Sequence, residues 1–200
     1  MQGIETKHPP GVICIVTGEL FRYSLAAQAI QNLRVPPGTI VSWQSGVLIA
    51  NGVNMGFRVL MERPELQWMW IMGDDHTFHP DVVLTLLGHE KDVIAPVCLA
   101  RLPPFDPVIV EHDHQPKGRL KYLEDLPIGP GIYKLRPEET CGDAGLLIRR
   151  NVVEALAPEK QGGEEWYARK KSGAHSAEDQ EFIAKVKDAG FDIHVDLGTM

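Results

Sequence analysis

The chain has few cysteines, no long apolar run and no excess of positive charge, and each absence excludes a class of protein. Its three cysteines, at positions 14, 98 and 141, form no CxxC pair. This spacing argues against a disulfide framework and predicts buried free thiols in a reducing compartment. No stretch approaches the ~20 apolar residues of a membrane-spanning helix, and the polar start of the chain does not resemble a secretory signal. We therefore expect a cytoplasmic protein without a membrane span.

Positive charge is in deficit, with 20 Lys and Arg against 27 Asp and Glu, so the net charge is 20 − 27 = −7. Proteins that wrap nucleic acid need clustered Lys and Arg, so nucleic acid is not the expected main partner. Hydrophobic residues make up 44% of the chain and charged residues 24%, which excludes a disordered chain. A length of 200 residues suits one α/β domain, which we place over residues 1–200.

Short apolar runs alternate with segments of helical periodicity along the first hundred residues. Strands are expected at 11–17, 39–43, 68–72 and 92–99, and helices at 22–33, 50–63 and 81–87. This alternation predicts a mainly parallel sheet flanked by helices. The run at 68–72 is apolar at every position, so we expect it near the centre of the sheet, with Trp68 and Trp70 in the core.

Prolines interrupt this pattern between about residues 102 and 140, where we expect an irregular insertion or a small antiparallel flap. Regular structure should resume with an apolar segment at 144–148, helices at 151–157 and 177–189, and a last strand at 191–195.

Two adjacent carboxylates, Asp74 and Asp75, follow the apolar run at 68–72. In open parallel sheets, ligands bind beyond the carboxyl ends of the strands. Carboxylate oxygens are also the ligands that Mg²⁺ and Mn²⁺ prefer, and substrate phosphates and water fill the remaining positions. The competing interpretation is that these aspartates only cap the helix that begins near Pro80. Position alone leaves both interpretations open.

The run WIMGDDHTFHPDVVLTLLGHEKDVIAPVCLARLPPF resembles the metal-binding core of nucleotide-sugar glycosyltransferases with the GT-A fold, of the family 2-like group. In that family an apolar strand ends in a DxD-type motif. CGDAGLLIRR at 141–150 resembles the family's Gly-rich strand under the donor sugar, which ends in a basic pair, and SAEDQEF at 176–182 resembles its ED motif. The resemblance covers about residues 11–199 and implies a GT-A, Rossmann-like fold.

The resemblance also implies roles for the acidic residues. Asp75 matches the last Asp of the DxD motif, which binds the Mn²⁺ or Mg²⁺ that bridges the donor diphosphate. Asp74 matches the middle position, near the donor ribose or diphosphate, and Gly73 stands where the first Asp would be. Asp179 matches the catalytic base of an inverting transfer, with Glu178 as its neighbour.

Donor-binding positions follow from the same resemblance. Thr17 and Glu19 follow the first strand, where the family lodges the nucleotide base, and Gly145 belongs to the Gly-rich strand. Asn54 and Arg58 lie near a position that often holds an Arg-Asn pair. The Asp that many members carry after the second strand is missing, so the base is not predicted. The sequence also leaves the sugar, the hydroxyl acceptor and the oligomeric state open.

Histidines support a further ligand and an alternative function. Several family members supply a metal ligand from a His beyond the last strand, and His76 and His175 are the candidates here. Alternatively, His76 and His79 with the aspartate pair would suit a zinc or di-metal hydrolase, to which His112 and His114 could contribute.

Gly73 and Ser176 each allow a second interpretation. The absence of the first DxD aspartate at Gly73 is also compatible with a non-catalytic nucleotide-sugar binding module. Ser176, three residues before Asp179, forms a capping signal, so Asp179 could serve only the helix start. The function expected from the resemblance is metal-dependent transfer of a sugar from a nucleotide diphosphate donor to a hydroxyl acceptor.

Overall fold

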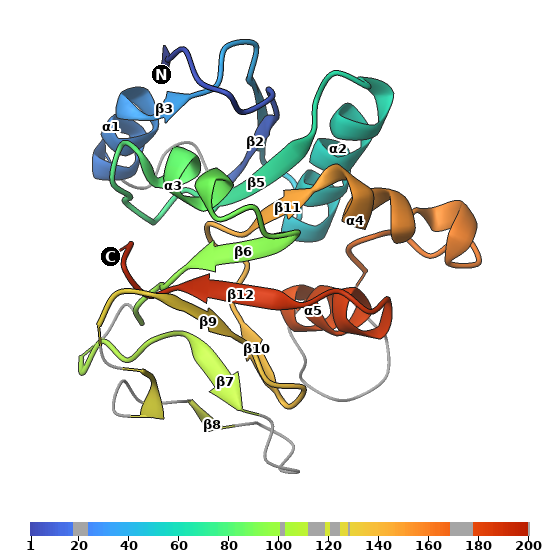
Figure 1. The fold of residues 1–200 in the computed structure, drawn as a ribbon. Coiled ribbons are helices and arrows are strands. Elements are labelled where there is room, and N and C mark those ends of the chain that lie inside the picture. The colour runs from blue at the N-terminus through green and yellow to red at the C-terminus, as the bar shows by residue number, and fades with distance from the viewer. Residues whose placement is uncertain are drawn as a thin grey trace.

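The computed structural model describes residues 1–17, 24–100, 103–111, 119–120, 125–127, 129–168 and 178–199. Its centre is a seven-stranded sheet in the order β4-β2-β5-β11-β6-β12-β9 (Figure 1). The strands are β2 (Val12–Thr17), β4 (Ile40–Ser45), β5 (Trp68–Gly73), β6 (Val93–Pro96), β9 (Ile132–Lys134), β11 (Leu147–Arg149) and β12 (Ile193–Asp196). The strand expected at 92–99 is therefore shorter, and the others lie close to their expected positions.

Strand directions confirm a mainly parallel sheet. β2, β4, β5, β6 and β12 all run the same way. β11 lies antiparallel between β5 and β6, and β9 pairs antiparallel with β12 at the edge. A strand late in the chain is thus inserted between two strands of the first half.

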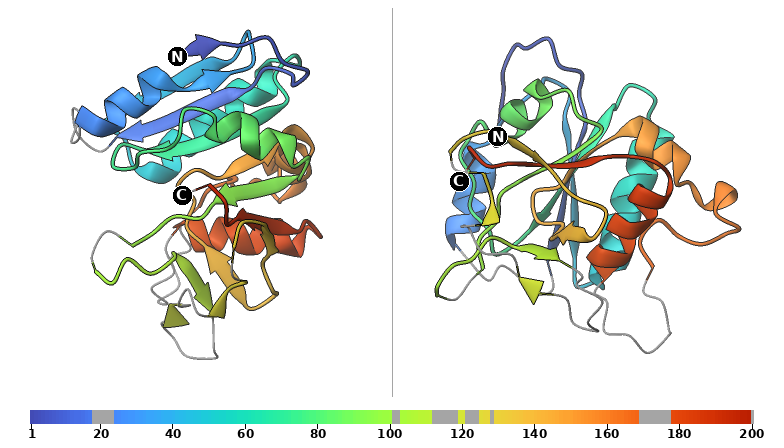
Figure 2. Two further views of the ribbon diagram at one scale, coloured as in Figure 1. Left: turned by 60° about the vertical axis from the view of Figure 1, so that its left-hand side comes forward. Right: turned by 60° about the horizontal axis from the view of Figure 1, so that its bottom comes forward.

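Helices cover both faces of the sheet, as the α/β pattern predicts (Figure 2). α2 (Ile49–Glu62), α4 (Arg150–Ala155) and α5 (Glu178–Asp188) pack on one face, and α1 (Ser24–Asn32) and α3 (Val82–Gly88) on the other. In α2 the apolar residues Val53, Phe57 and Leu60 recur at helical spacing and are fully buried. A short 3-10 helix, Pro158–Lys160, follows α4.

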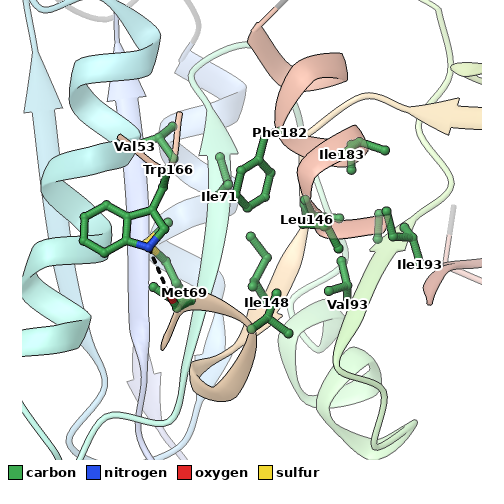
Figure 3. Packing of buried hydrophobic residues seen from close by; sticks show 14 of the residues in the cluster. Val53, Met69, Ile71, Val93, Leu146, Ile148, Trp166, Phe182, Ile183 and Ile193 are labelled. Atoms are coloured by element: carbon green, nitrogen blue, oxygen red, sulfur yellow. Dashed lines mark hydrogen bonds between the residues drawn. The ribbon is translucent and has the colours of Figure 1, made fainter. Parts of the chain in front are cut away.

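The side chains of β5 supply both halves of the core. Trp68 and Trp70 point to the face covered by α1 and α3, while Met69 and Ile71 point to the face covered by α2 and α5. Figure 3 shows the second half, where Phe182 of α5 lies beside Ile71. Both tryptophans are 0% exposed, which confirms the expected core position of this strand.

The proline-rich stretch contains several paired β-strands and is not simply irregular. β7 (Ile109–Glu111) lies between β10 (Glu139–Cys141) and β8 (Arg119–Leu120) in a small antiparallel sheet, as one of the two expectations had it. β9 comes from the same stretch but extends the central sheet. A further two-stranded sheet joins β1 (Gln2–Gly3) to β3 (Arg34–Val35). None of the helices described above is both long and apolar enough to cross a bilayer.

Candidate functional site

The carboxyl ends of the parallel strands define one edge of the central sheet, which we call the carboxyl edge. Thr17, Gly73 and Pro96 are the last residues of β2, β5 and β6 and lie along this edge. Because β11 runs the opposite way, the residues that precede it come to the same edge. The Gly145 N–H donates to the Ile71 carbonyl at 2.7 Å, which fixes this preceding segment beside the end of β5.

The carboxylate of Asp75 folds back toward the strand that it follows. A Cβ on Gly73 would lie 3.0 Å from Asp75 Oδ1, so glycine leaves room for this carboxylate. His76 Nδ1 lies 2.6 Å from the same oxygen, and the His76 ring stacks on Phe78. A side chain at position 73 would require the Asp75 carboxylate to shift slightly.

Asp74 contributes a different feature. Its Oδ2 is buried and has no hydrogen-bond partner among the residues that the structure describes. Burying a carboxylate oxygen without a donor is unfavourable, so such an oxygen is a natural ligand for a cation or for a donor group of a substrate.

Asp143 is a site residue that the sequence pattern did not reveal. It lies in the segment before β11, and its Oδ2 accepts a hydrogen bond from the Tyr167 hydroxyl at 2.8 Å. Burial raises the pKa of Asp143 to about 6, and the negative charge of Asp179 adds to the increase. The only signal in the sequence was an acidic residue inside the Gly-rich segment Cys141–Gly145, of which only Gly145 was expected at the site.

Cys98 shows that Asp75 and Asp143 belong to one neighbourhood. Its thiol donates to the Ala144 carbonyl at 3.2 Å. Burial raises the pKa of Cys98 to about 12, and the negative charges of both Asp143 and Asp75 contribute to the increase. The charges of the carboxylates that follow β5 and precede β11 therefore both act on the same thiol.

Asp179 lies in the first turn of α5, with its carboxylate partly buried. Its Oδ1 accepts the backbone N–H of Gln180 at 2.8 Å. Burial raises the pKa of Asp179, the bond from Gln180 opposes the increase, and the charge of Glu178 adds to it. Asp179 thus accepts a backbone N–H in the first turn of α5, and its charge also acts on Asp143. Ser176, the expected capping residue, lies outside the described residues.

Asn54 and Arg58 both hold the segment that carries Tyr167. The Asn54 side chain donates to the Tyr167 carbonyl at 2.8 Å and accepts the Tyr167 N–H at 2.9 Å. Arg58 forms an ion pair with Glu165 near the surface. In the structure these two side chains therefore fix residues 165–167 against α2.

Of the remaining donor-binding predictions, Thr17 and Gly145 lie on or beside the carboxyl edge. Thr17 is 1% exposed at the end of β2, while Glu19 lies outside the described residues. Gly145 has φ +78°, and a Cβ there would lie 2.7 Å from Pro96 Cγ. Both facts require glycine at this position, because any side chain would be strained and would collide with β6.

The basic pair Arg149–Arg150, at the end of the Gly-rich strand, lies at the edge of the sheet opposite the carboxyl edge. Arg149 pairs with Trp68 at the amino end of β5. The Arg150 guanidinium donates to the carbonyls of Leu60 and Met61 at the end of α2 and to Glu154. The whole length of β5 separates this pair from Asp75. The strand has six residues, each of which adds a rise of about 3.3 Å. Arg150 thus closes α2, Arg149 donates to the carbonyls of Leu87 and Lys91 near the end of α3, and neither side chain reaches the carboxyl edge.

The histidines that the structure describes do not assemble into a metal centre. His79 Nδ1 accepts the N–H of Asp81 at 3.2 Å, so it serves the start of α3. Within the described ranges, no three His, Cys, Asp or Glu side chains are placed to hold one metal ion. His112, His114 and His175 lie outside those ranges. The three-ligand set that a zinc hydrolase requires is therefore not formed by the described side chains.

No protein-family model and no curated protein matches the chain. Solved structures do match it. A197 from STIV has a TM-score of 0.57 at 11% identity, over 95% of this chain and 83% of that one. The 4-diphosphocytidyl-2C-methyl-D-erythritol synthase from Anaerococcus prevotii DSM 20548 has a TM-score of 0.50 at 9% identity, over 94% and 89%. The chain shares a Rossmann-like α/β fold with these proteins.

Proposed function

We propose that the protein is a metal-dependent glycosyltransferase that moves a sugar from a nucleotide diphosphate donor to a hydroxyl acceptor. One observation carries the proposal. Asp75, Asp143 and Asp179 come from three separate segments, and their charges act on one another or on the shared thiol of Cys98 at the carboxyl edge. This edge is where open parallel sheets bind their ligands.

A divalent cation, Mn²⁺ or Mg²⁺, fits the donor set after β5. Such cations commonly take one or two protein carboxylates and fill their remaining positions with phosphate oxygens and water. Asp75 supplies one carboxylate and the unpartnered Oδ2 of Asp74 a second. His76, within 2.6 Å of Asp75, is the third candidate ligand or the residue that orients that carboxylate. When bound, the cation would supply Lewis-acid stabilisation of the departing diphosphate.

Asp179 is the proposed base, with Glu178 as its acidic neighbour. An inverting transfer needs a carboxylate that takes the proton of the acceptor hydroxyl while its oxygen attacks the anomeric carbon. Burial raises the pKa of Asp179, which brings it closer to the value that favours proton transfer near neutral pH. Its bond to the start of α5 fixes the carboxylate in position.

The fold supports a nucleotide ligand more generally. The name of the synthase from Anaerococcus prevotii describes a diphosphocytidyl compound, so this fold carries nucleotide chemistry in at least one similar protein. Thr17, Glu19 and Gly145 remain the predicted contacts to the nucleotide and donor. Asn54 and Arg58 would then act indirectly, through the segment that carries Tyr167.

A thermal-shift screen of UDP-, GDP-, CMP- and dTDP-sugars, with and without Mn²⁺, tests donor binding. We expect a Mn²⁺-dependent increase in the melting temperature with one of them. Asp75→Ala should then abolish metal-dependent binding of the nucleoside diphosphate in calorimetry, while the matched control Asp188→Ala on exposed surface should not. Unchanged metal-dependent affinity in Asp75→Ala would show that the site is misassigned.

A measurement of diphosphate release, with the donor that the screen identifies, separates a working enzyme from a binding module. The binding module is the second interpretation that Gly73 allows. An enzyme releases the nucleoside diphosphate when an acceptor, or water, is present. A protein that binds the donor in a Mn²⁺-dependent manner but never releases the diphosphate, with alcohols and simple sugars as acceptors, would be a binding module.

A further inference from the structure

The outermost strand on one side of the central sheet, β4, is open and carries no charge. No described strand pairs with β4 on the side away from β2, which we call the β4 edge. All six residues of β2 are buried, whereas Ser42 is the one buried residue of β4. Residues 35–57, which include β4 and the start of α2, contain no Asp, Glu, Lys, Arg or His, although 24% of the chain is charged.

The strand on the other side of the sheet, β9, is protected against pairing with another chain. It has three residues, against the six of β4, and its Lys134 forms an ion pair with Asp192 at 2.7 Å. Short strands and lysines at a sheet edge are devices by which proteins prevent such pairing. β4 has neither device, so it remains a template for a further strand.

The backbone of β4 determines which groups a further strand would meet. The Ile40 N–H donates to the Gly11 carbonyl, and the Gly46 N–H donates to the Thr17 carbonyl. In a parallel pair, alternate residues of a strand direct both their N–H and their C=O to the same neighbour, so the even-numbered residues of β4 face β2. The residues that direct these groups to the β4 edge are the odd-numbered ones, Val41, Trp43 and Ser45.

One side of α2 lies above the β4 edge. A Cβ on Gly52 would lie 3.2 Å from the Cβ of Gln44, so this part of the helix packs over β4. Asn54 marks the other side of the helix, because its side chain binds the backbone of Tyr167 toward the middle of the sheet. The residues that share a side with Gly52 therefore face outward past β4.

That outward side of α2 carries an apolar stripe. Leu48, Gly52, Met55 and Val59 follow one another at spacings of four, three and four residues, so they share one side of the helix. The side chain of Leu48 is 74% exposed, that of Met55 is 43% exposed, and that of Val59 is half-buried. Contiguous exposed apolar side chains beside an open strand are typical of a protein–protein interface.

We infer that β4 pairs antiparallel with β4 of a second copy of this chain, so that the two central sheets join into one. A two-fold axis that is perpendicular to the sheet and passes beside Trp43 places Val41 of each copy opposite Ser45 of the other. The outward backbone groups of one copy then meet those of the other. The same axis keeps both α2 helices on one face of the joined sheet, where their apolar stripes face each other.

Charge favours a second copy as the occupant of the β4 edge. Two chains that each carry a net charge of −7 repel one another, and close approach is least unfavourable where neither presents a charged side chain. The segment 35–57 provides such a surface on both copies. A strongly charged partner would find no complementary charge on it, whereas a two-fold axis satisfies the same groups on both chains at once.

Sedimentation velocity of the full chain tests this pairing, and we expect a dimer of twice 22.2 kDa. Ser45→Pro removes an N–H that points away from β2, and proline is tolerated at such positions of edge strands. Because the change occurs twice in a dimer, two hydrogen bonds are lost, and the dissociation constant should rise about thirty-fold.

Met55→Lys tests the contribution of α2 and keeps the test valid if Ser45→Pro does not fold. It brings two like charges together across the axis, so we expect the dissociation constant to rise by about ten-fold or more. Ile132→Lys on β9 is the matched control, because Ile132 is 39% exposed and Met55 is 43% exposed. The control should sediment as the wild type does, and circular dichroism checks that each variant is folded.

Cross-linking provides a readout that does not depend on affinity. In the inferred pairing, the Cα atoms of residue 43 in the two copies lie about 5.5 Å apart. A short thiol cross-linker should therefore join two chains of Trp43→Cys. It should not join chains of Ile132→Cys or of the wild type, whose own cysteines are buried or half-buried.

Three results would overturn the pairing. The first is a wild-type protein that stays monomeric at its highest soluble concentration. The second is a dimer that folded Ser45→Pro and Met55→Lys leave unchanged, or that Ile132→Lys weakens equally. The third is cross-linking through position 132 and not through position 43. None of these measurements involves the donor, so their results leave the proposed function untouched.

Discussion

The carboxyl edge of the central sheet and the opposite edge, which we call the amino edge, both contain buried charged groups. The two edges differ in how many hydrogen-bond partners these groups have. At the amino edge, the Arg150 guanidinium makes five hydrogen bonds, four of them to carbonyls around the end of α2. At the carboxyl edge, one buried oxygen of Asp74 accepts no hydrogen bond from the described part of the chain, and burial raises the pKa of both Asp143 and Asp179. A charge whose donors or acceptors are all satisfied stabilises the fold, whereas one left incomplete is available to a ligand.

The largest expected effect concerns catalysis at the carboxyl edge. Asp179→Asn removes the proposed base and should reduce transfer by roughly 10²- to 10⁴-fold. Donor binding should be spared, because the amide oxygen can still accept the N–H of Gln180. Rates would be measured with the nucleotide sugar that the thermal-shift screen identifies, and Asp188→Asn in the same helix is the control. Wild-type turnover in Asp179→Asn would leave this residue with only its helix-capping role.

Arg150→Met tests the opposite edge, where we expect an effect on stability. Removing the guanidinium takes one donor from each of four carbonyls, of which those of Leu60 and Arg63 keep a backbone N–H, at a cost of about 2–4 kcal/mol of unfolding free energy. Arg63→Met, which changes an exposed side chain, is the matched control. Urea unfolding measures both variants. The contrast between the edges breaks down if Arg150→Met unfolds like the wild type, or if the folded variant no longer binds the donor.

Asp143→Asn should show that the carboxyl edge is not built for stability. The folded pKa of Asp143, about 6, lies above its ordinary value of 3.8. The folded state therefore binds the proton more tightly than the unfolded state, and the charge destabilises the fold increasingly as pH rises from about 4 to about 6. Above that range the variant should be more stable than the wild type by up to about 3 kcal/mol. Below pH 4 the difference should vanish.

Urea unfolding of the wild type and Asp143→Asn at several pH values between 4 and 8 measures this difference. Asp192→Asn, in an exposed ion pair with Lys134, serves as a control for general charge effects. A stability difference that does not change with pH would contradict the assigned environment of Asp143.

The smallest predicted effects compare two residues that hold the same segment. Asn54→Ala removes two buried hydrogen bonds to the Tyr167 backbone and should cost about 1–3 kcal/mol. Arg58→Ala removes an exposed ion pair with Glu165 and should cost less than about 1 kcal/mol. Thermal unfolding of both variants tests whether Asn54→Ala is the more destabilising. An equal loss of stability in the two variants would show that the buried hydrogen bonds contribute no more than the exposed ion pair.

Much of the fold could be predicted from the sequence, because side-chain periodicity reports local burial. The apolar run at 68–72 predicted a central strand with buried tryptophans, and the structure confirms it. The proline-rich stretch was harder, since its short strands have too few residues to show a period. One of them, β9, pairs with the central sheet, which local composition does not reveal.

The candidate site was predictable only in part. Asp75 follows an apolar strand, so the general rule for parallel sheets pointed to it. Asp143 was missed because its importance depends on Tyr167 and Asp179, which are distant in sequence. The motif did not show at which edge Arg149 and Arg150 lie, because their position depends on the direction in which β11 pairs with β5 and β6.

By itself, the sequence determined which segments are strands and helices, which side chains are buried in them, and that two aspartates end a central strand. The tertiary structure alone decided that β11 enters the sheet antiparallel between β5 and β6. That direction brings Asp143 to the carboxyl edge and sends Arg149 and Arg150 to the amino edge. The physical reason is that periodicity reflects the burial of each residue, whereas strand direction and long-range hydrogen bonds depend on how distant segments pack together.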